Sequence, residues 1–138
     1  MATPEGIERE ILIRAPIERV WALVSEPGWW ISDADGDRTG QVRSREGGHE
    51  VVDDPRNGRH VFEAVATQPP VRAVYRWIHG APGLTTLVEF LLSEEAGGTR
   101  LRVVESGIAA IPGDRAQYRR DNAEGWEIEL NIARRRAQ

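Results

Sequence analysis

The sequence contains no cysteine and no lysine. Without cysteine, the chain cannot form a disulfide bond, a thiolate metal cluster or a cysteine nucleophile. Without lysine, it has no side-chain amine for a Schiff base and no lysine for a phosphate-binding loop. All 18 basic residues are therefore arginines, a bias that we attribute to genome composition rather than to function.

Long hydrophobic runs are also absent. No stretch approaches the ~18 consecutive apolar residues that a membrane span needs, and residues 1–6 lack the apolar segment of a targeting sequence. We therefore expect a cytoplasmic protein that does not bind a membrane. The net charge is −4 and the arginines are scattered except at 134–136, which predicts no nucleic-acid partner.

The length and composition favour one globular domain. A chain of 138 residues has no room for a second domain, so we expect a single unit over 1–138. Hydrophobic residues at 40% and charged residues at 29% exclude a disordered or fibrous protein.

The N-terminal part predicts a strand followed by a helix. Residues 7–14 alternate loosely between apolar and charged side chains, which is typical of a strand. Pro16 occupies the position where a helix begins. The next apolar residues recur at the spacing of one buried helical face: Ile17, Val20, Trp21 and Val24. Residues 25–28 end this helix, and residues 29–31 fit either a short second helix or a loop.

The rest of the chain predicts an antiparallel sheet and one long helix. Residues 40–107 contain short alternating runs separated by turn residues such as Pro55–Gly58 and Glu94–Gly98. From Asp114, a suitable N-cap, to Arg136 there is no proline and one glycine, which favours a long helix. Such a sheet needs one face covered, and only this helix is long enough to cover it.

Alternation along the strands indicates which side chains face the helix. Tyr75 and Trp77 lie opposite Arg72 and Arg76, so we expect the aromatic side chains to point inward. By the same rule Glu105 points inward, although burying a carboxylate without a partner is costly. Two interpretations stay open. Glu105 is either half solvated or paired with an arginine at the strand end, or it is the polar anchor of a ligand site.

The long helix carries one apolar stripe and two further isoleucines. The stripe consists of Ala123, Trp126, Leu130 and Ala133, and it should pack on the sheet. Ile128 and Ile132 lie on roughly the opposite side. They predict a second surface that either loops or another copy of the chain, in a homodimer, would cover.

An ordered set of motifs resembles a known family. The motifs are Ile11-x-Ile13-x-Ala15-Pro16-x-Glu18-Arg19-Val20-Trp21, Pro69-Pro70 leading into Tyr75-Arg76-Trp77, Thr86-Leu87-Val88-Glu89-Phe90, Gly98-Thr99-x-Leu101-x-Val103-Val104-Glu105-Ser106-Gly107, and Glu124-Gly125-Trp126. Together they resemble the bacterial proteins similar to the C-terminal domain of the heat shock protein 90 ATPase activator, in the START-like or SRPBCC superfamily. The resemblance covers about residues 7–135.

The resemblance implies an α+β helix-grip fold. In this fold a curved antiparallel sheet of about six or seven strands surrounds a long C-terminal helix, with one or two short helices after the first strand. A cavity between helix and sheet holds the ligand in related proteins. The positions that match the cavity wall and its entrance are Trp29, Trp30, Tyr75, Trp77, Val88, Phe90, Val103, Glu105, Trp126 and Leu130.

Function stays open between different classes. The first hypothesis is a binding protein for a small hydrophobic molecule, without a cofactor. The second is a small cyclase-like enzyme that uses His79 or Glu105 for proton transfer, provided that the two residues meet. A chaperone-associated co-factor is a third alternative. The histidines, His49, His60 and His79, lack the spacing of metal ligands, so we expect no metal site.

Overall fold

The computed structural model describes residues 6–32, 35–79, 85–107 and 115–138. Its elements are β1 (Ile7–Ile13), α1 (Ile17–Val24), β2 (Val42–Glu46), β3 (His49–Asp54), β4 (Gly58–Gln68), β5 (Arg72–Ile78), β6 (Thr85–Glu95), β7 (Gly98–Ser106) and α2 (Arg115–Ala137). The expected N-cap, Asp114, lies outside the described residues. The order of elements is the one that the sequence predicts.

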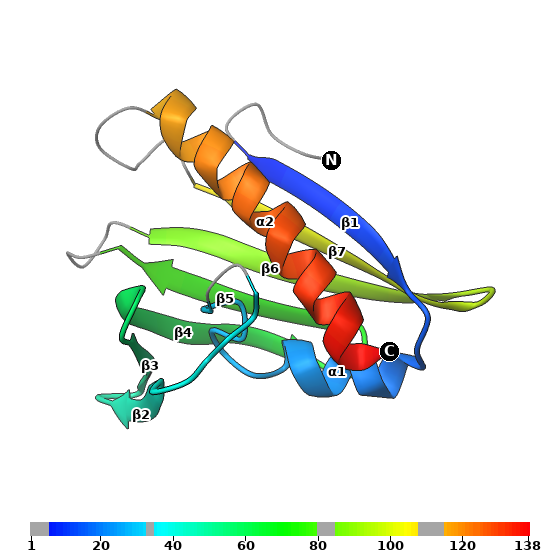
Figure 1. Cartoon of the computed structure of the whole chain (residues 1–138), viewed down its shortest axis with the longest axis horizontal. Helices are drawn as coiled ribbons and strands as arrows, with labels where there is room; N and C mark the ends of the chain where they lie inside the picture. Colours follow the sequence, from blue (N-terminus) through cyan, green and yellow to red (C-terminus); the bar gives the residue numbers. More distant parts are fainter. Residues whose placement is uncertain (1–5, 33–34, 80–84, 108–114) are drawn as a thin grey trace.

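All seven strands belong to one antiparallel sheet in the order β1-β7-β6-β5-β4-β3-β2. Figure 1 shows α2 crossing one face of this sheet diagonally, with α1 near its C-terminal end. A hydrogen bond from Arg19 Nη1 to the Ala137 carbonyl (3.2 Å) joins the two helices. The α+β helix-grip fold is therefore confirmed.

The alternation along the strands assigned their two faces correctly. Tyr75, Phe90 and Val103 are buried on the face beneath α2. The opposite face carries ion pairs, such as Arg72 with Glu89 and Arg102 with Glu8. Charged side chains stay in water while the apolar side chains of the other face form the core.

One expectation about the first helical region needs correction, and one open alternative is decided. Trp21 is only half-buried, because it lies about 100° around α1 from Val20 and so at the margin of the buried face of Ile17, Val20 and Val24. Residues 29–31 form no helix, and the alternative of a loop is the one that the structure shows. The buried face of α1 is thus narrower than the spacing of its apolar residues suggested.

A loop covers the second apolar surface of α2. Ile132 is only 2% exposed, and Gly36 packs directly against its side chain. Ile128, by contrast, is 37% exposed. Of the two alternatives for covering Ile132, the loop is the one that the structure shows.

Candidate functional site

A buried carboxylate joins α2 to the sheet. Glu105 lies on the inward face of β7 and its side chain is fully buried. Its Oε2 accepts hydrogen bonds from Thr86 Oγ1 (2.8 Å) and Tyr118 OH (3.0 Å). Its Oε1 accepts from Asn122 Nδ2 and Trp126 Nε1, both at 3.0 Å. Four donors therefore replace the water that the carboxylate loses on burial.

The donors come together because of two simple periodicities. Tyr118, Asn122 and Trp126 are spaced four residues apart, so they share one side of α2. Thr86 is two residues from Val88, the partner of Glu105 in the β6–β7 register, and so lies on the same face of the sheet. None of the four donors is an arginine. The expectation of a solvated or arginine-paired Glu105 is thus wrong, whereas its inward direction is confirmed.

His79 joins this cluster indirectly. Its Nε2 lies 2.9 Å from Thr86 Oγ1 and 3.3 Å from Tyr118 OH. Both hydroxyl protons are directed to Glu105, so the hydroxyl oxygens can only accept from His79. Nε2 must therefore carry the proton. His79 directly follows β5, whereas Glu105 is on β7, and β6 lies between these two strands. The two hydroxyl groups bridge His79 and Glu105.

Burial determines the protonation states around Glu105. Burial lowers the pKa of His79, and His60 lowers it further, while the charge of Glu105 acts in the opposite direction. The imidazole is consequently neutral near pH 7. Burial and the neighbouring Glu105 raise the pKa of Tyr118, so its hydroxyl stays protonated. Tyr118 and Asn122 were not anticipated, although their spacing from Trp126 is a signal that could have found them.

An aromatic cluster fills most of the space between α2 and the sheet. Trp30 is its centre, with six aromatic rings at centroid distances of 5.0–6.0 Å: Trp29, Phe62, Tyr75, Trp77, Phe90 and Trp126. Only 4% of Trp30 is exposed. The interior over Tyr75 and Phe90, where the sequence placed a cavity, is therefore occupied by the indole of Trp30.

Backbone contacts hold Trp30 in this position. A Cβ at Gly28 would lie 2.6 Å from a ring carbon of Phe62, and Gly28 has φ +69°, so only glycine fits there. Arg43 donates to the carbonyls of Pro27 (2.7 Å) and Gly28 (3.0 Å). Tyr75 OH donates to the Val24 carbonyl (2.8 Å). The segment after α1 is thereby attached directly to the sheet.

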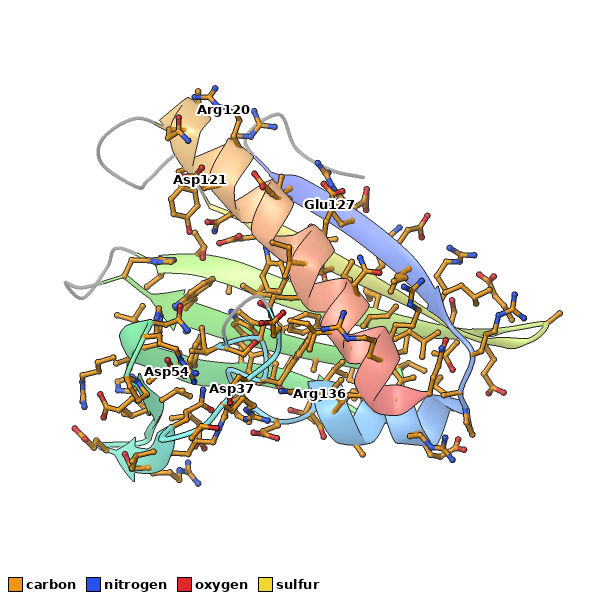
Figure 2. All side chains as sticks on the ribbon, in the orientation of Figure 1. Asp37, Asp54, Arg120, Asp121, Glu127 and Arg136 are labelled. Atoms are coloured by element: carbon orange, nitrogen blue, oxygen red, sulfur yellow. The ribbon has the colours of Figure 1, made fainter. Side chains whose placement is uncertain are left out.

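A pocket of about 200 Å³ remains beside the aromatic cluster. Its lining residues are Trp30, Ile31, Ser32, Asn57, His60, Trp77, Asp121, Asn122, Gly125, Trp126 and Glu129. The pocket lies between α2, the segment after α1, the start of β4 and the end of β5. Asp121, one of its lining residues, is labelled on α2 in Figure 2. Asn122 and Trp126 both line this pocket and bind Glu105.

The sequence-predicted site residues divide into three groups. Trp30, Trp77 and Trp126 line the pocket. Those packed in the core instead are Trp29, Tyr75, Val88, Phe90, Val103 and Leu130. Glu105 is not among the described lining residues, but it binds two of them, Asn122 and Trp126. The lining residues that the sequence did not predict are mainly polar. They come from α2, from the segment after α1, and from the turn before β4 and the start of β4.

A buried aspartate fixes the polar rim of the pocket. Asp54 accepts hydrogen bonds from Gln41 Nε2 (2.9 Å) and from the backbone N–H of Arg56 (2.8 Å) and Asn57 (3.0 Å). Burial alone would raise the pKa of Asp54, but these bonds outweigh it and hold the pKa far below its usual range. Asn57 Nδ2 in turn donates to the Ser32 carbonyl (3.0 Å). The two loops at the rim are thus joined.

The centre of the pocket wall on α2 is a glycine. A Cβ built on Gly125 meets no atom within 4 Å. Glycine in a helix interior destabilises the helix by about 1 kcal/mol relative to alanine. No close packing in the described structure requires this glycine, and the missing side chain leaves space in the pocket.

Among the described residues, no group of three or more histidine, aspartate or glutamate side chains lies close enough together to hold a metal ion. The described part of the chain also contains no helix that is long and apolar enough to cross a membrane.

Comparison with solved structures shows the same fold in several proteins. Protein MLL2253 from Mesorhizobium loti has a TM-score of 0.71 at 20% identity, over 95% of each chain. The Aha1 dimer from Colwellia psychrerythraea has 0.70 at 14% identity, over 94% of this chain and 92% of that one. The di-domain ARO/CYC BexL, from the BE-7585A biosynthetic pathway, has 0.63 at 18% identity; it aligns with 99% of this chain, which spans about half of BexL (52%).

The sheet, the long C-terminal helix and the pocket between them define a START-like (SRPBCC) helix-grip protein. Within this class, the chain belongs to the family described as activator of Hsp90 ATPase homolog 1-like protein, which matches residues 14–132. No curated protein matches the sequence. The resemblance that the sequence motifs indicated is therefore confirmed.

Proposed function

We propose that this protein binds a small hydrophobic, aromatic molecule in the pocket beside Trp30, Trp77 and Trp126. The open space at Gly125 is the observation that carries the proposal. Glycine makes the helix less stable than alanine would, and no neighbouring atom in the described structure is too close for a side chain at this position. A pocket of about 200 Å³ is smaller than the roughly 300–1,000 Å³ typical of drug-sized ligands. The ligand is accordingly small, on the scale of one substituted aromatic ring.

Related folds support a ligand-binding role without naming the ligand. BexL is described as a di-domain ARO/CYC protein from a biosynthetic pathway. The pocket here has the general form of a small-molecule site, with aromatic walls and a few polar groups such as Asn122 and Asn57. A binder of this kind needs no cofactor.

The geometry of Glu105 favours binding over catalysis. A general base must come within hydrogen-bond reach of its substrate. Glu105 is fully buried, and its two oxygens already accept four hydrogen bonds. It therefore acts as the anchor that positions Asn122 and Trp126 in the pocket wall, rather than as the proton acceptor of a cyclase-like enzyme.

Filling the pocket tests the proposal. A library of small aromatic compounds is screened by thermal shift against the wild type, and the affinity of each hit is measured by calorimetry. Gly125→Leu places a side chain in the open space, so we expect it to abolish binding while the variant unfolds at the same temperature or higher. Glu124→Leu adds the same side chain at the neighbouring, exposed position and should bind as the wild type does.

Two results would overturn the proposal: no compound binds the wild type, or the hits bind Gly125→Leu equally well. A chaperone-associated role, which the family description suggests, does not depend on the pocket. In that case, stimulation of an Hsp90 ATPase would be the same for the wild type and Gly125→Leu.

A further inference from the structure

The charged groups of the pocket have one sign. Two carboxylates, Asp121 and Glu129, belong to its lining, whereas none of the lining residues is an arginine. This is notable in a chain that has 18 arginines. The other polar lining residues, Ser32, Asn57 and Asn122, carry no charge.

The two carboxylates flank the open space at Gly125. Asp121 precedes Gly125 by four residues and Glu129 follows it by four, so all three lie on one stripe of α2. Each carboxylate-bearing residue is thus about 6 Å along the helix axis from Gly125. A ligand placed where the side chain is missing would have an acidic residue on either side.

Asp121 and Glu129 each accept a hydrogen bond from a neutral side chain. Gln117 Nε2 donates to Asp121 Oδ1 (2.7 Å), and Ser32 Oγ donates to Glu129 Oε1 (3.4 Å). Arg136, about two turns further along α2, is close enough to Glu129 for their charges to interact. Its guanidinium, however, donates to the Gly36 carbonyl (2.6 Å) and is not part of the pocket lining. The described side chains that line the pocket therefore include two carboxylates and no arginine.

The aromatic walls add a second attraction for positive charge. Tryptophan has the most favourable ring face for a cation, within about 6 Å of the ring centroid. Trp30, Trp77 and Trp126 all line this small pocket, so a cation inside it lies within that range of at least one indole. His60 also lines it; its Nε2 donates to the Asn57 carbonyl (2.8 Å).

We propose that the ligand of this pocket is a small organic cation, namely an amine or quaternary ammonium group on an aromatic body. The proposal rests on the pocket being a binding site, as argued above. The body packs on the indoles, and the charged group lies between the Asp121 and Glu129 carboxylates. Carboxylate-bearing molecules of the same size are excluded by repulsion.

Three matched probes test this charge preference: phenethylamine, 2-phenylethanol and phenylacetate, which are cationic, neutral and anionic at pH 7. We expect phenethylamine to bind at least ten times more tightly than 2-phenylethanol, and phenylacetate not to bind. The double variant Asp121→Asn/Glu129→Gln should remove most of the advantage of phenethylamine and leave the affinity for 2-phenylethanol unchanged. Glu124→Gln, an exposed acid on the same helix, is the control and should change neither affinity.

The outcomes separate this proposal from the one on which it rests. If 2-phenylethanol or phenylacetate binds as tightly as phenethylamine, the charge preference is wrong, while the pocket is still a binding site. If phenethylamine binds the double variant as it binds the wild type, the two carboxylates do not recognise the cation. Both proposals fail if none of the three probes binds and if no compound of the wider screen binds the wild type more tightly than it binds Gly125→Leu.

Discussion

At the scale of single residues, Glu105 determines how α2 sits on the sheet. Its carboxylate is the common acceptor for donors from β6 and α2. A buried charge that loses its partners is costly, and buried donors that lose their acceptor are costly as well. The position of Trp126 in the pocket wall therefore depends on a residue outside the pocket.

Removing the carboxylate should destabilise the protein strongly. Glu105→Leu leaves four donors without their acceptor, and we expect a loss of about 3–5 kcal/mol in the free energy of unfolding. Glu105→Gln keeps one acceptor oxygen for Asn122 and Trp126, so its loss should be clearly smaller. Urea denaturation measures both, with Glu94→Gln, an exposed acid on β6, as the control. A Glu105→Leu variant as stable as the control would show that the cluster is not an anchor.

His79 should make stability depend on pH in a defined window. Burial lowers its pKa in the folded state, so the unfolded chain binds a proton at a higher pH than the folded chain does. The contribution of the neutral His79 to stability is therefore fully present above about pH 6.5, the pKa of histidine in the unfolded chain. This contribution is lost as the pH falls below that value. Asp54, whose pKa is lowered in the folded state, changes the stability only near and below its ordinary pKa of 3.8.

The variant His79→Gln isolates this contribution. Glutamine keeps an N–H donor for Thr86 and Tyr118 but does not titrate. Chemical denaturation between pH 5 and pH 7.5 should show a flatter pH dependence for His79→Gln than for the wild type. His49→Gln, a partly exposed position, should retain the wild-type profile. Equal slopes for the wild type and His79→Gln would contradict the assignment of a neutral, buried His79.

The Glu105 cluster was only partly predictable from sequence. The alternation along β7 correctly predicted the direction of the Glu105 side chain, because the strand period is two and Leu101 and Val103 on the same face are apolar. Its partners depend on how α2 is rotated over the sheet. The sequence allowed a half-solvated or arginine-paired Glu105, whereas the structure pairs Glu105 with neutral donors.

At the scale of elements, two glycines have opposite roles. Gly98, at the start of β7, lies against β1: a Cβ there would be 2.1 Å from the carbonyl oxygen of Ile13. A Cβ at Gly125 in α2, by contrast, would have no atom within 4 Å. Close backbone packing requires the first glycine, whereas we attribute the second to the pocket.

Alanine substitutions at these two positions should therefore change the free energy of unfolding in opposite directions. Gly98→Ala forces β1 and β7 apart and should cost about 2 kcal/mol or more. Gly125→Ala should stabilise the helix by about 0.5–1 kcal/mol. Thermal and urea unfolding of the two single variants give the comparison. A destabilised Gly125→Ala would mean that the helix needs glycine for a structural reason, and it would remove the argument for a functional space.

The sequence predicted the elements better than it predicted the loops between them. Strands and α2 have clear periodicity, and their turns contain glycine and proline at the expected places. Residues 29–31 have no such pattern, since three large apolar residues follow one another. Only tertiary packing decides that Trp30 enters the core, and this one side chain fills the space where a larger cavity was expected.

At the scale of the whole molecule, the protein has a helix-grip fold in which side chains fill most of the space between α2 and the sheet. The family match and the fold were predictable, because an ordered set of motifs spans nearly the whole chain. The exact pocket was not, since its walls come from α2, the segment after α1 and the ends of two strands. The central claim is that the pocket beside Gly125 is the binding site of this fold.

The most direct test is the ¹⁵N-edited NMR spectrum of the tryptophan indole N–H groups, recorded while the tightest compound of the aromatic screen is added. The five tryptophans give separate reporters. Trp77 and Trp126 line the pocket, Trp29 lies in the core, and Trp21 lies at the edge of the buried face of α1. We predict saturable shifts for Trp77 and Trp126 in the wild type, unchanged signals for Trp21 and Trp29, and no shifts in Gly125→Leu. Saturable shifts confined to Trp21 or Trp29, or identical shifts in Gly125→Leu, would contradict the account.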